Sequence, residues 1–354
     1  MNKLIKVGCS ALCGSLATMA TVNAGEMTVS GSADVTWLSK TGVVTGNPIG
    51  VNSALTFAGS GELDNGWTIA YTIANLDASA FSSAAVGLTM GGLGTININQ
   101  GDSGNGIAAY DDKMPSAWEE AWGTGLSTGV RLAVGGAASM NVTYTTPTIL
   151  GTTISVLYAP QYGVADTGDK ATASNDTFRD SAYDATININ PSLGTEILSG
   201  LNIFAGASTI KTVEDSGIAG DAYQGVGGVT YSLGPLSVGY QVSGDYTGYD
   251  AIQSPGADTA KWNYYQNFAY GVAFNVNDSL SVSYGKWEAK KAGYSDTSVN
   301  IVDESLRTVV VDSIQAAYTM GGATFRVAQT TVDNQGFVAG ANVEATTVSM
   351  GLAF

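Results

Sequence analysis

The chain has 354 residues, of which 46 are glycine, 14 are lysine or arginine and 30 are aspartate or glutamate. No apolar run beyond the N-terminal segment is long enough to cross a bilayer as a helix, which excludes an α-helical membrane protein. With 44% hydrophobic and 12% charged residues, the chain buries apolar surface and is not a disordered protein. Its negative net charge of −16 excludes nucleic acid as a partner.

The first 24 residues have the pattern of a secretory signal peptide. Lys3 and Lys6 supply positive charge, a mostly apolar stretch follows over 7–19, and Val22-Asn23-Ala24 fits a cleavage site. We expect residues 25–354 to form the mature protein as one domain. Without Lys3 and Lys6 it has 12 basic and 30 acidic residues, a net charge of −18.

The mature sequence alternates apolar and polar residues nearly throughout, which is typical of strands with one apolar and one polar face. Turn residues (Gly, Asn, Asp and Ser) interrupt this pattern and divide it into segments. The predicted strands are 27–38, 51–63, 67–75, 83–91, 95–100, 139–147, 152–159, 182–190, 200–210, 222–233, 236–245, 260–276, 280–288, 307–320, 323–332 and 343–354.

The polar face of these strands indicates where the apolar face lies. A soluble barrel has its apolar face inside and carries Lys and Glu outside, but here the polar positions are mostly Thr, Ser, Asn and Gly. That composition fits an inverted barrel, in which polar residues line a lumen and apolar residues meet lipid. The sequence therefore predicts an all-β fold, a transmembrane antiparallel β-barrel.

The connections differ in length in the way expected of such a barrel, with tight turns at one rim and long loops at the other. Short connections lie at 64–66, 91–94, 233–235, 277–279 and 321–322, and long polar ones at 160–181, 211–221, 245–259, 289–306 and 333–342.

The strand count depends on residues 129–135, which alternate weakly and would make the total 17. If both termini lie at the rim of the short turns, the number must be even. We therefore assign 101–138 to one long loop, with one or two helical turns over 115–122, and predict 16 strands.

Several short motifs resemble those of the Gram-negative trimeric general porins. The chain ends in an alternating stripe, 348–354, whose last residue is Phe354; further similar stretches are 61–66, 87–98 and 144–151. The resemblance spans the mature chain.

The resemblance implies a homotrimer in the bacterial outer membrane. Short turns would then face the periplasm and long loops the exterior, and the third external loop, 101–138, would fold inward and narrow each pore. Phe354 would be recognised by the barrel-assembly machinery, and membrane lipid and lipopolysaccharide would surround the barrel.

Loop 101–138 carries more acids than bases. It contains Asp102, Asp111, Asp112, Glu119 and Glu120, with Lys113 and Arg131 as its bases. Acids at a narrow, low-dielectric constriction raise the local concentration of cations. The alternative is that these acids lie on a solvated loop surface.

The wall opposite the loop departs from the family pattern, which sets a row of arginines or lysines there. The inward charges read from the first four strands are Asp34 and Glu62. Arg326 is the candidate for a basic residue in the lumen; the alternative is a role at the rim or in pairing with the loop.

The mature chain lacks the residue types that most catalytic and metal sites require. Histidine is absent, and Cys9 and Cys13 both fall in the signal peptide, so Ser/His/Asp hydrolysis and thiolate or imidazole metal sites are excluded. We predict no enzymatic activity and no cofactor, apart from weak Ca²⁺ or Mg²⁺ binding by acidic loops such as 166–184.

The sequence thus predicts an outer-membrane porin, a water-filled passive channel for small hydrophilic solutes and ions that prefers cations. One alternative is a substrate-specific channel, for which Tyr265 and Trp287 are the only inward aromatic candidates. Another is a secreted structural or surface-layer β-protein, which the terminal stripe and the connection lengths disfavour.

Overall fold

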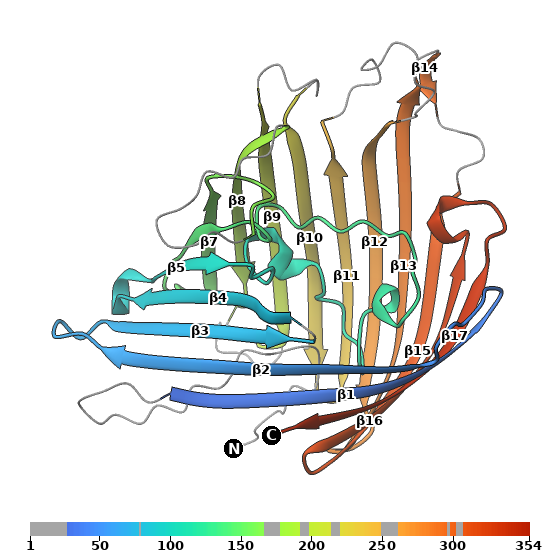
Figure 1. Ribbon diagram of the computed structural model, residues 1–354, viewed down its shortest axis with the longest axis horizontal. Helices are drawn as coiled ribbons and strands as arrows, with labels where there is room; N and C mark the ends of the chain where they lie inside the picture. Colours follow the sequence, from blue (N-terminus) through green and yellow to red (C-terminus); the bar gives the residue numbers. More distant parts are fainter. Residues whose placement is uncertain are drawn as a thin grey trace.

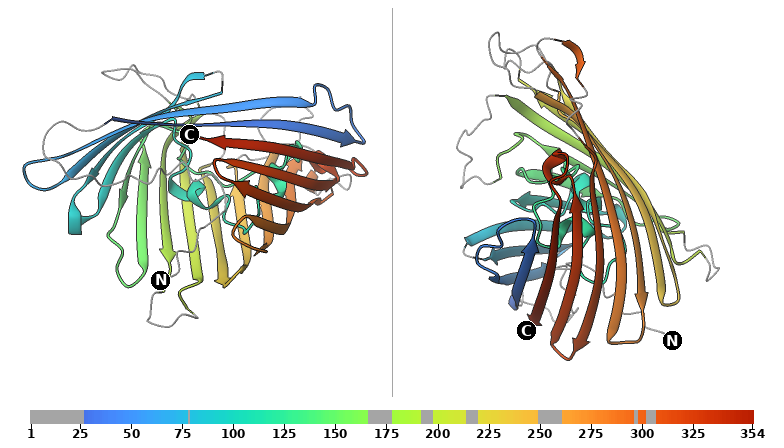
Figure 2. Two further views of the ribbon diagram at one scale, coloured as in Figure 1. Left: turned by 90° about the horizontal axis from the view of Figure 1, so that it is seen from below. Right: turned by 90° about the vertical axis from the view of Figure 1, so that its right-hand side faces the viewer.

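The computed structural model describes residues 27–77, 79–165, 178–191, 198–213, 220–248, 261–295, 298–301 and 307–354. The predicted signal peptide lies outside these ranges, as does most of the acidic loop 166–184. The described residues form an antiparallel sheet that is closed on itself (Figures 1 and 2).

The strands follow the predicted segments closely. They are β1 (Met27–Thr41), β2 (Ile49–Glu62), β3 (Thr68–Leu76), β4 (Ser79–Thr89), β5 (Thr95–Gln100), β6 (Asn141–Thr145), β7 (Thr152–Ala159), β8 (Arg179–Ile189), β9 (Leu201–Thr212), β10 (Ala222–Leu233), β11 (Leu236–Tyr246), β12 (Lys261–Asn275), β13 (Leu280–Ser295), β14 (Ser298–Ile301), β15 (Val309–Met320), β16 (Ala323–Asp333) and β17 (Val343–Ala353).

Sixteen of these strands form the closed barrel, as the parity of the termini predicts. β1 pairs with β2 on one side and with β17 on the other, which closes the ring. β14 is an additional four-residue strand that pairs only with the tip of β13, while β13 and β15 pair directly. In Figure 1, β1–β4 run across the view and β9–β13 run up it.

Two boundaries differ from the prediction by more than three residues. The connection expected over 76–82 is tight, because β3 ends at Leu76, Asp77 takes a positive φ of 54°, and β4 begins at Ser79. β13 continues seven residues beyond the predicted end at 288. Charged residues occupy outward positions at this end of β13, among them Lys286, Glu288 and Lys290, and they interrupt the alternation of apolar and polar residues.

The alternation places apolar side chains on the outer face of the barrel. On β1, Val35 and Trp37 point outward with 39% and 46% of their surface exposed, while Asp34 and Thr36 point inward. Outward tyrosines pair near the long-loop ends of the strands, with ring centroids 5.0 Å apart for Tyr158–Tyr183 and 6.4 Å for Tyr223–Tyr246. An apolar belt with aromatic edges is the outer surface expected of a membrane-spanning barrel.

The principal cluster of buried apolar residues lies inside the ring, where residues of the β5–β6 connection pack against the inner wall. It includes Ile107, Met114, Ala121, Leu126 and Ala133 from the connection. From the wall it includes Phe204, Trp287, Val309 and Val332. The connection is therefore a packed part of the interior and does not extend away from the rim.

Candidate functional site

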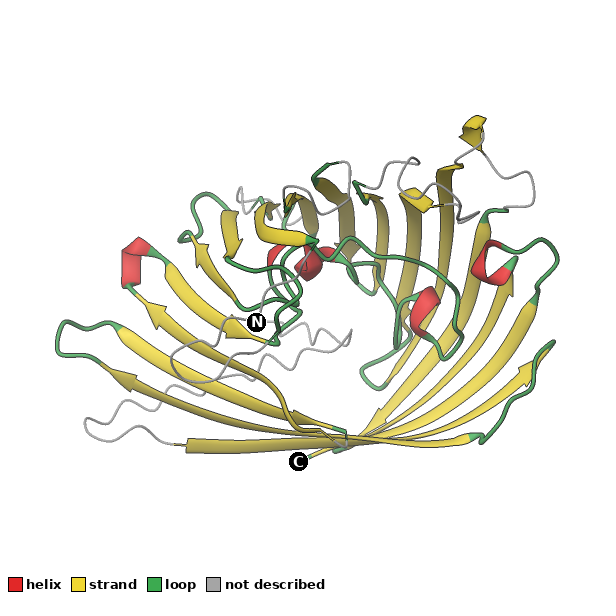
Figure 3. Ribbon diagram, turned by 45° about the horizontal axis from the view of Figure 1, so that its top comes forward, coloured by secondary structure: helices red, strands yellow, loops and turns green. Residues whose placement is uncertain are grey.

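The candidate site is the connection between β5 and β6, residues 101–140, which we call the inner loop. Figure 3 shows it, with two of its 3₁₀ turns, within the ring of strands. Those turns are η2 (Gly106–Tyr110) and η3 (Ala121–Gly123), and no residue of the inner loop is in a β-strand. The prediction of one long loop here, without an extra strand over 129–135, therefore matches the structure.

The predicted helix over 115–122 is wrong, apart from η3 at its end. The backbone N–H groups of Trp118 and Glu119 both donate to Gln315 Oε1 on β15, at 3.1 Å each. Ala117 N–H donates to Ser283 Oγ on β13 at 2.8 Å. A helix starting at Pro115 would need the Glu119 N–H for its own first hydrogen bond, so the bond from Glu119 to Gln315 competes with the helix.

Asp184 on β8 holds the beginning and the end of the inner loop together. Its carboxylate accepts the Ile107 N–H at 3.1 Å and the Gly136 N–H at 3.2 Å. Only 4% of its surface is exposed. Nearby, Tyr110 stacks on Phe204 with ring centroids 5.0 Å apart.

The returning part of the inner loop is anchored to β10–β12. Arg131 forms an ion pair with Asp245, and its backbone carbonyl accepts a hydrogen bond from Asn267 Nδ2 at 2.8 Å. The Gly135 N–H donates to Gln224 Oε1 at 2.7 Å. Arg131 is thus a structural anchor, and it is paired with an acid that the sequence did not single out.

The inner loop covers one side of the interior and leaves the other side accessible. Most inward polar residues on β11–β17 are buried, and Gln241, Gln315 and Thr330 are at most 2% exposed. Inward residues of β1–β3, among them Thr36, Ser60 and Thr72, are partly exposed. An aqueous path can therefore run between the free edge of the inner loop and the hydroxyl-rich wall of β1–β4.

Four of the predicted loop charges lie at that free edge. Asp112 and Lys113 are 3.8 Å apart and equally exposed. Burial, with a contribution from neighbouring Asp112, raises the pKa of Asp111 to about 7. Burial also raises the pKa of Glu119 to about 7, with Arg326 opposing and Asp34 adding to the shift.

The structure places Glu120 away from water, in contrast to the predicted constriction position. Glu120 is 5% exposed, and its Oε1 accepts the Met114 N–H at 2.6 Å. Burial raises the pKa of Glu120 well above its usual value, which favours the neutral form of the carboxyl group. Glu120 therefore supports the loop from within.

Arg326 and Asp34 join the wall to the loop. Arg326 on β16 points inward, as predicted, and its guanidinium donates to Asp34 Oδ1 on β1 at 2.7 Å. Its Cζ lies 5.9 Å from the ring centroid of Trp118, within the range of a cation–π contact. Of the three roles given for Arg326, this position combines that of a lumen base with that of a partner of the loop; it does not represent the role at the rim.

The remaining predicted residues lie at the margins of the interior. Asp102 starts the inner loop, and its carboxylate accepts the Gly104 N–H at 3.0 Å. Glu62 is exposed beside the tight β2–β3 turn. Phe354 follows β17, and its backbone N–H and carbonyl pair with Gly31 at 3.0 and 2.8 Å.

The inward aromatic residues pack against loops. Trp287 is 1% exposed, and its ring makes an edge contact with Trp122 at 6.2 Å between centroids. Tyr265 lies between Arg131, at 5.3 Å, and Phe337, at 6.3 Å. They do not form a ladder of aromatic faces along the accessible wall.

Three functional residues escaped the sequence interpretation: Asp184, Asp245 and Gln315. Each is a large polar residue at an inward position of a strand whose inward neighbours are mostly small. That contrast is a signal that could have identified them as partners of an inserted loop.

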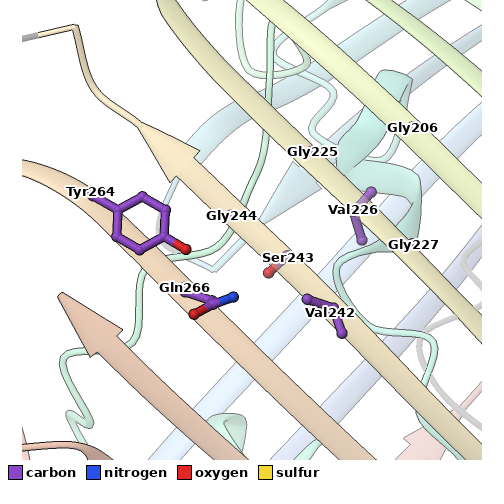
Figure 4. Close-up of a pocket in the computed structure, with 9 residues that line it drawn as sticks. All are labelled: Gly206, Gly225, Val226, Gly227, Val242, Ser243, Gly244, Tyr264 and Gln266. Atoms are coloured by element: carbon purple, nitrogen blue, oxygen red, sulfur yellow. The ribbon is translucent and has the colours of Figure 1, made fainter. Parts of the chain in front are cut away.

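Elsewhere the described residues show few features of other kinds of site. Within the described ranges no helix is long and apolar enough to cross a membrane, and no three acidic, histidine or cysteine side chains are grouped to hold a metal ion. A depression of about 380 Å³ lies on the outer face of β9–β12, away from the inner loop (Figure 4). Its lining includes Gly225, Gly227 and Gly244, with Tyr264 and Gln266 beside them.

Known structures share this fold, although the sequences have diverged widely. The chain aligns with OmpF of Salmonella typhi in complex with daunomycin at 13% identity and a TM-score of 0.63, over 93% of this chain and 98% of that one. It aligns with an anion-selective porin from Comamonas acidovorans at 13% identity and a TM-score of 0.60, over 94% and 100%.

A third similar structure is outer-membrane expressed OmpT of Vibrio cholerae, at 10% identity, a TM-score of 0.61 and coverage of 95% and 100%. No protein-family model and no curated protein matches the sequence. The predicted resemblance to porins is therefore confirmed as a likeness of fold: this chain has the sixteen-stranded barrel that these structures share.

Proposed function

We propose that this protein, which has the porin fold, forms a water-filled channel through which small hydrophilic solutes and ions diffuse passively. The observation that carries the proposal is the contrast between the two inner walls: β11–β17 are covered by the inner loop, while β1–β3 present accessible hydroxyl groups. A barrel built only for structure would have no use for an accessible polar interior. We also infer that the protein is not an enzyme.

The surroundings of the channel follow from the outer surface. An apolar belt edged by tyrosines fits a bilayer, and we place the barrel in the bacterial outer membrane, in contact with lipid and lipopolysaccharide. Export by residues 1–24, assembly as a homotrimer and recognition of Phe354 by the barrel-assembly machinery belong to the same proposal. The channel as proposed needs no cofactor.

The charges at the free edge of the inner loop favour cations. Two of the four acids near the path have basic partners, because Asp34 pairs with Arg326 and Asp112 lies beside Lys113. Asp111 and Glu119 form no ion pair among the described residues, so they supply negative charge that increases as they ionise around pH 7. The anion-selective porin of similar fold indicates that local charge decides selectivity, not the barrel itself.

A substrate-specific channel is not favoured by the interior. Its best aromatic candidates, Tyr265 and Trp287, are engaged with Arg131, Phe337 and Trp122. A structural role, the other alternative, requires the outer apolar faces to pack against protein, and here they surround a closed ring.

The test is reconstitution of the purified, folded protein in a planar bilayer under a salt gradient. The proposal predicts stepwise conductance and a reversal potential of cation sign. If the protein is a homotrimer, the conductance steps should come in groups of three. Inserted protein that never conducts would overturn the channel, whereas conductance with an anion-sign potential would overturn only the cation preference.

A further inference from the structure

Six small residues form a continuous line across the inner wall under the inner loop. The strand register pairs Gly239 with Gly271, Gly271 with Gly285, and Gly285 with Ser313. Ser313 pairs with Thr330, which pairs with Ala345. The line therefore crosses β11, β12, β13, β15, β16 and β17 without a large side chain.

The inner loop follows this line. Met114 and Pro115 lie over the glycines of β11 and β12, and Ala121 lies over Gly285. Thr124 reaches Thr330 with 2.5 Å between their hydroxyl oxygens, and its carbonyl accepts a hydrogen bond from Thr347 at 2.9 Å. We call the line of six small residues the shelf.

The first two glycines of the shelf leave no room for a side chain. A Cβ at Gly271 would lie 2.7 Å from the Pro115 carbonyl oxygen and 2.9 Å from its nitrogen. A Cβ at Gly239 would lie 2.6 Å from Pro115 Cδ and 3.2 Å from Met114 Sδ. At Gly285 the nearest atom would be Ala121 Cβ at 3.4 Å, an ordinary contact.

These distances imply that an added Cβ at either glycine would push the inner loop in one direction, away from the wall. Behind the shelf is the hydrogen-bonded wall, which cannot yield without breaking its ladder, whereas the accessible path lies on the other side of the loop. To restore contact at 3.4 Å, the backbone of Pro115 must move from 2.7 Å by about 0.7 Å, toward the path.

We propose that Gly239 and Gly271 are positioning residues that set the aperture of the channel, because they allow the inner loop to lie directly on the wall. This inference rests on the proposed channel function. It adds that aperture depends on backbone contact at the shelf, and not only on the side chains that line the path.

The first experiment compares single-channel conductance of Gly271→Ala and Gly271→Leu with that of the unaltered protein. Conductance should fall in the alanine variant and fall further in the leucine variant. Gly225→Ala on β10 is the matched control, because its Cβ would point outward and meet nothing closer than 3.7 Å. Among alanine variants of the three shelf glycines, Gly285→Ala should change the conductance least.

A second-site change separates displacement from general damage. At Gly239 the nearest loop atoms are Cδ in the Pro115 ring and the flexible Met114 Sδ, and Thr230 Cγ2 of the wall lies at 3.1 Å. At Gly271 the nearest atoms are the Pro115 backbone oxygen and nitrogen, and Met114 Cβ lies at 3.0 Å. Pro115→Ala should therefore restore conductance to Gly239→Ala but not to Gly271→Ala. Equal rescue of both variants, or of neither, would overturn the proposed contacts.

A crosslink measures how closely the inner loop lies on the wall without relying on conductance. It can also be used if the leucine variant does not assemble. Cysteines replacing Ala117 and Ser283 stand where the loop amide and wall hydroxyl are 2.8 Å apart. Thiol crosslinking should drop in Gly271→Ala and stay high in Gly225→Ala. Unchanged crosslinking together with unchanged conductance in Gly271→Ala would overturn the inference. If the unaltered protein does not conduct at all, that result would instead overturn the proposed channel function.

Discussion

At the scale of single residues, the uncompensated acids of the inner loop make selectivity depend on pH. Burial raises the pKa values of Asp111 and Glu119 to about 7, so both groups are neutral in acid and charged in base. Cation preference should therefore increase from pH 5 to pH 9, since at two units below the pKa roughly 1% of each group is ionised. Reversal potentials at fixed salt gradient measure this.

The double variant Asp111→Asn with Glu119→Gln should remove most of that pH dependence. Asp64→Asn, in the exposed β2–β3 turn, is the control that should leave it intact. A steep pH dependence that survives the double variant would assign it to other groups. Because the folded loop holds these protons more tightly than an unfolded chain, its stability should decline as pH rises from about 4 toward 7.

The pair of Arg326 and Asp34 predicts opposite changes in selectivity. Arg326→Ala leaves Asp34 without its 2.7 Å partner, so cation preference should rise. Asp34→Asn leaves the guanidinium uncompensated, and cation preference should fall. The double variant should lie between the two single ones in reversal potential; shifts in the same direction from both would contradict a charge effect at this pair.

At the scale of elements, Gln315 connects β15 to the inner loop through three hydrogen bonds. Its Oε1 accepts the Trp118 and Glu119 N–H groups, and its Nε2 donates to the Glu119 carbonyl at 2.6 Å. Gln315→Ala removes bonds worth about 1 kcal/mol each. Limited proteolysis of the folded barrel should then cut within 114–124 faster.

Gln329→Ala is the control for that experiment, because Gln329 faces outward on the neighbouring strand β16 and accepts a hydrogen bond from Thr346. Its cleavage rate should match that of the unaltered protein. Equal protection of Gln315→Ala would show that other contacts hold this segment.

The strands could be predicted from the sequence because period-2 alternation is a local signal. Stretches such as Trp67 to Ile73 contain their own evidence, and the boundaries agree to within a few residues. The signal failed where outward charges interrupt it on β13 and where a tight turn follows β3. β14 has only four residues, too few to show a period.

The existence of the inner loop could be predicted from the sequence, but its path could not. Its acids are visible in the sequence, whereas their exposure depends on contacts between segments far apart in the chain, such as Gln315 with Glu119. Asp245 pairs with Arg131 across 114 positions of sequence. The shelf is equally invisible, because only the register of six strands brings its residues into line.

At the scale of the whole molecule, the barrel closes where the ends of the chain meet. β17 pairs with β1, and the backbone of Phe354 adds two hydrogen bonds to Gly31. The Phe354 side chain is 76% exposed, so its ring contributes little to folded stability. The proposed role of Phe354 is therefore in assembly.

Phe354→Ala tests that role by separating assembly from stability. The variant should refold in detergent with nearly the melting temperature of the unaltered protein, but its yield in the outer membrane of cells should fall. Heat-modifiable mobility on gels reports folded barrel in both settings. A loss of equal size in detergent would assign the effect to stability instead.

The central claim is that an acidic inner loop and an accessible hydroxyl-rich wall together form a passive, cation-preferring channel. The most direct test is single-channel recording of the folded protein in a planar bilayer at neutral pH under a salt gradient. The account predicts stepwise conductance with a reversal potential of cation sign. Inserted protein that stays silent, or a reversal potential of anion sign, would contradict it.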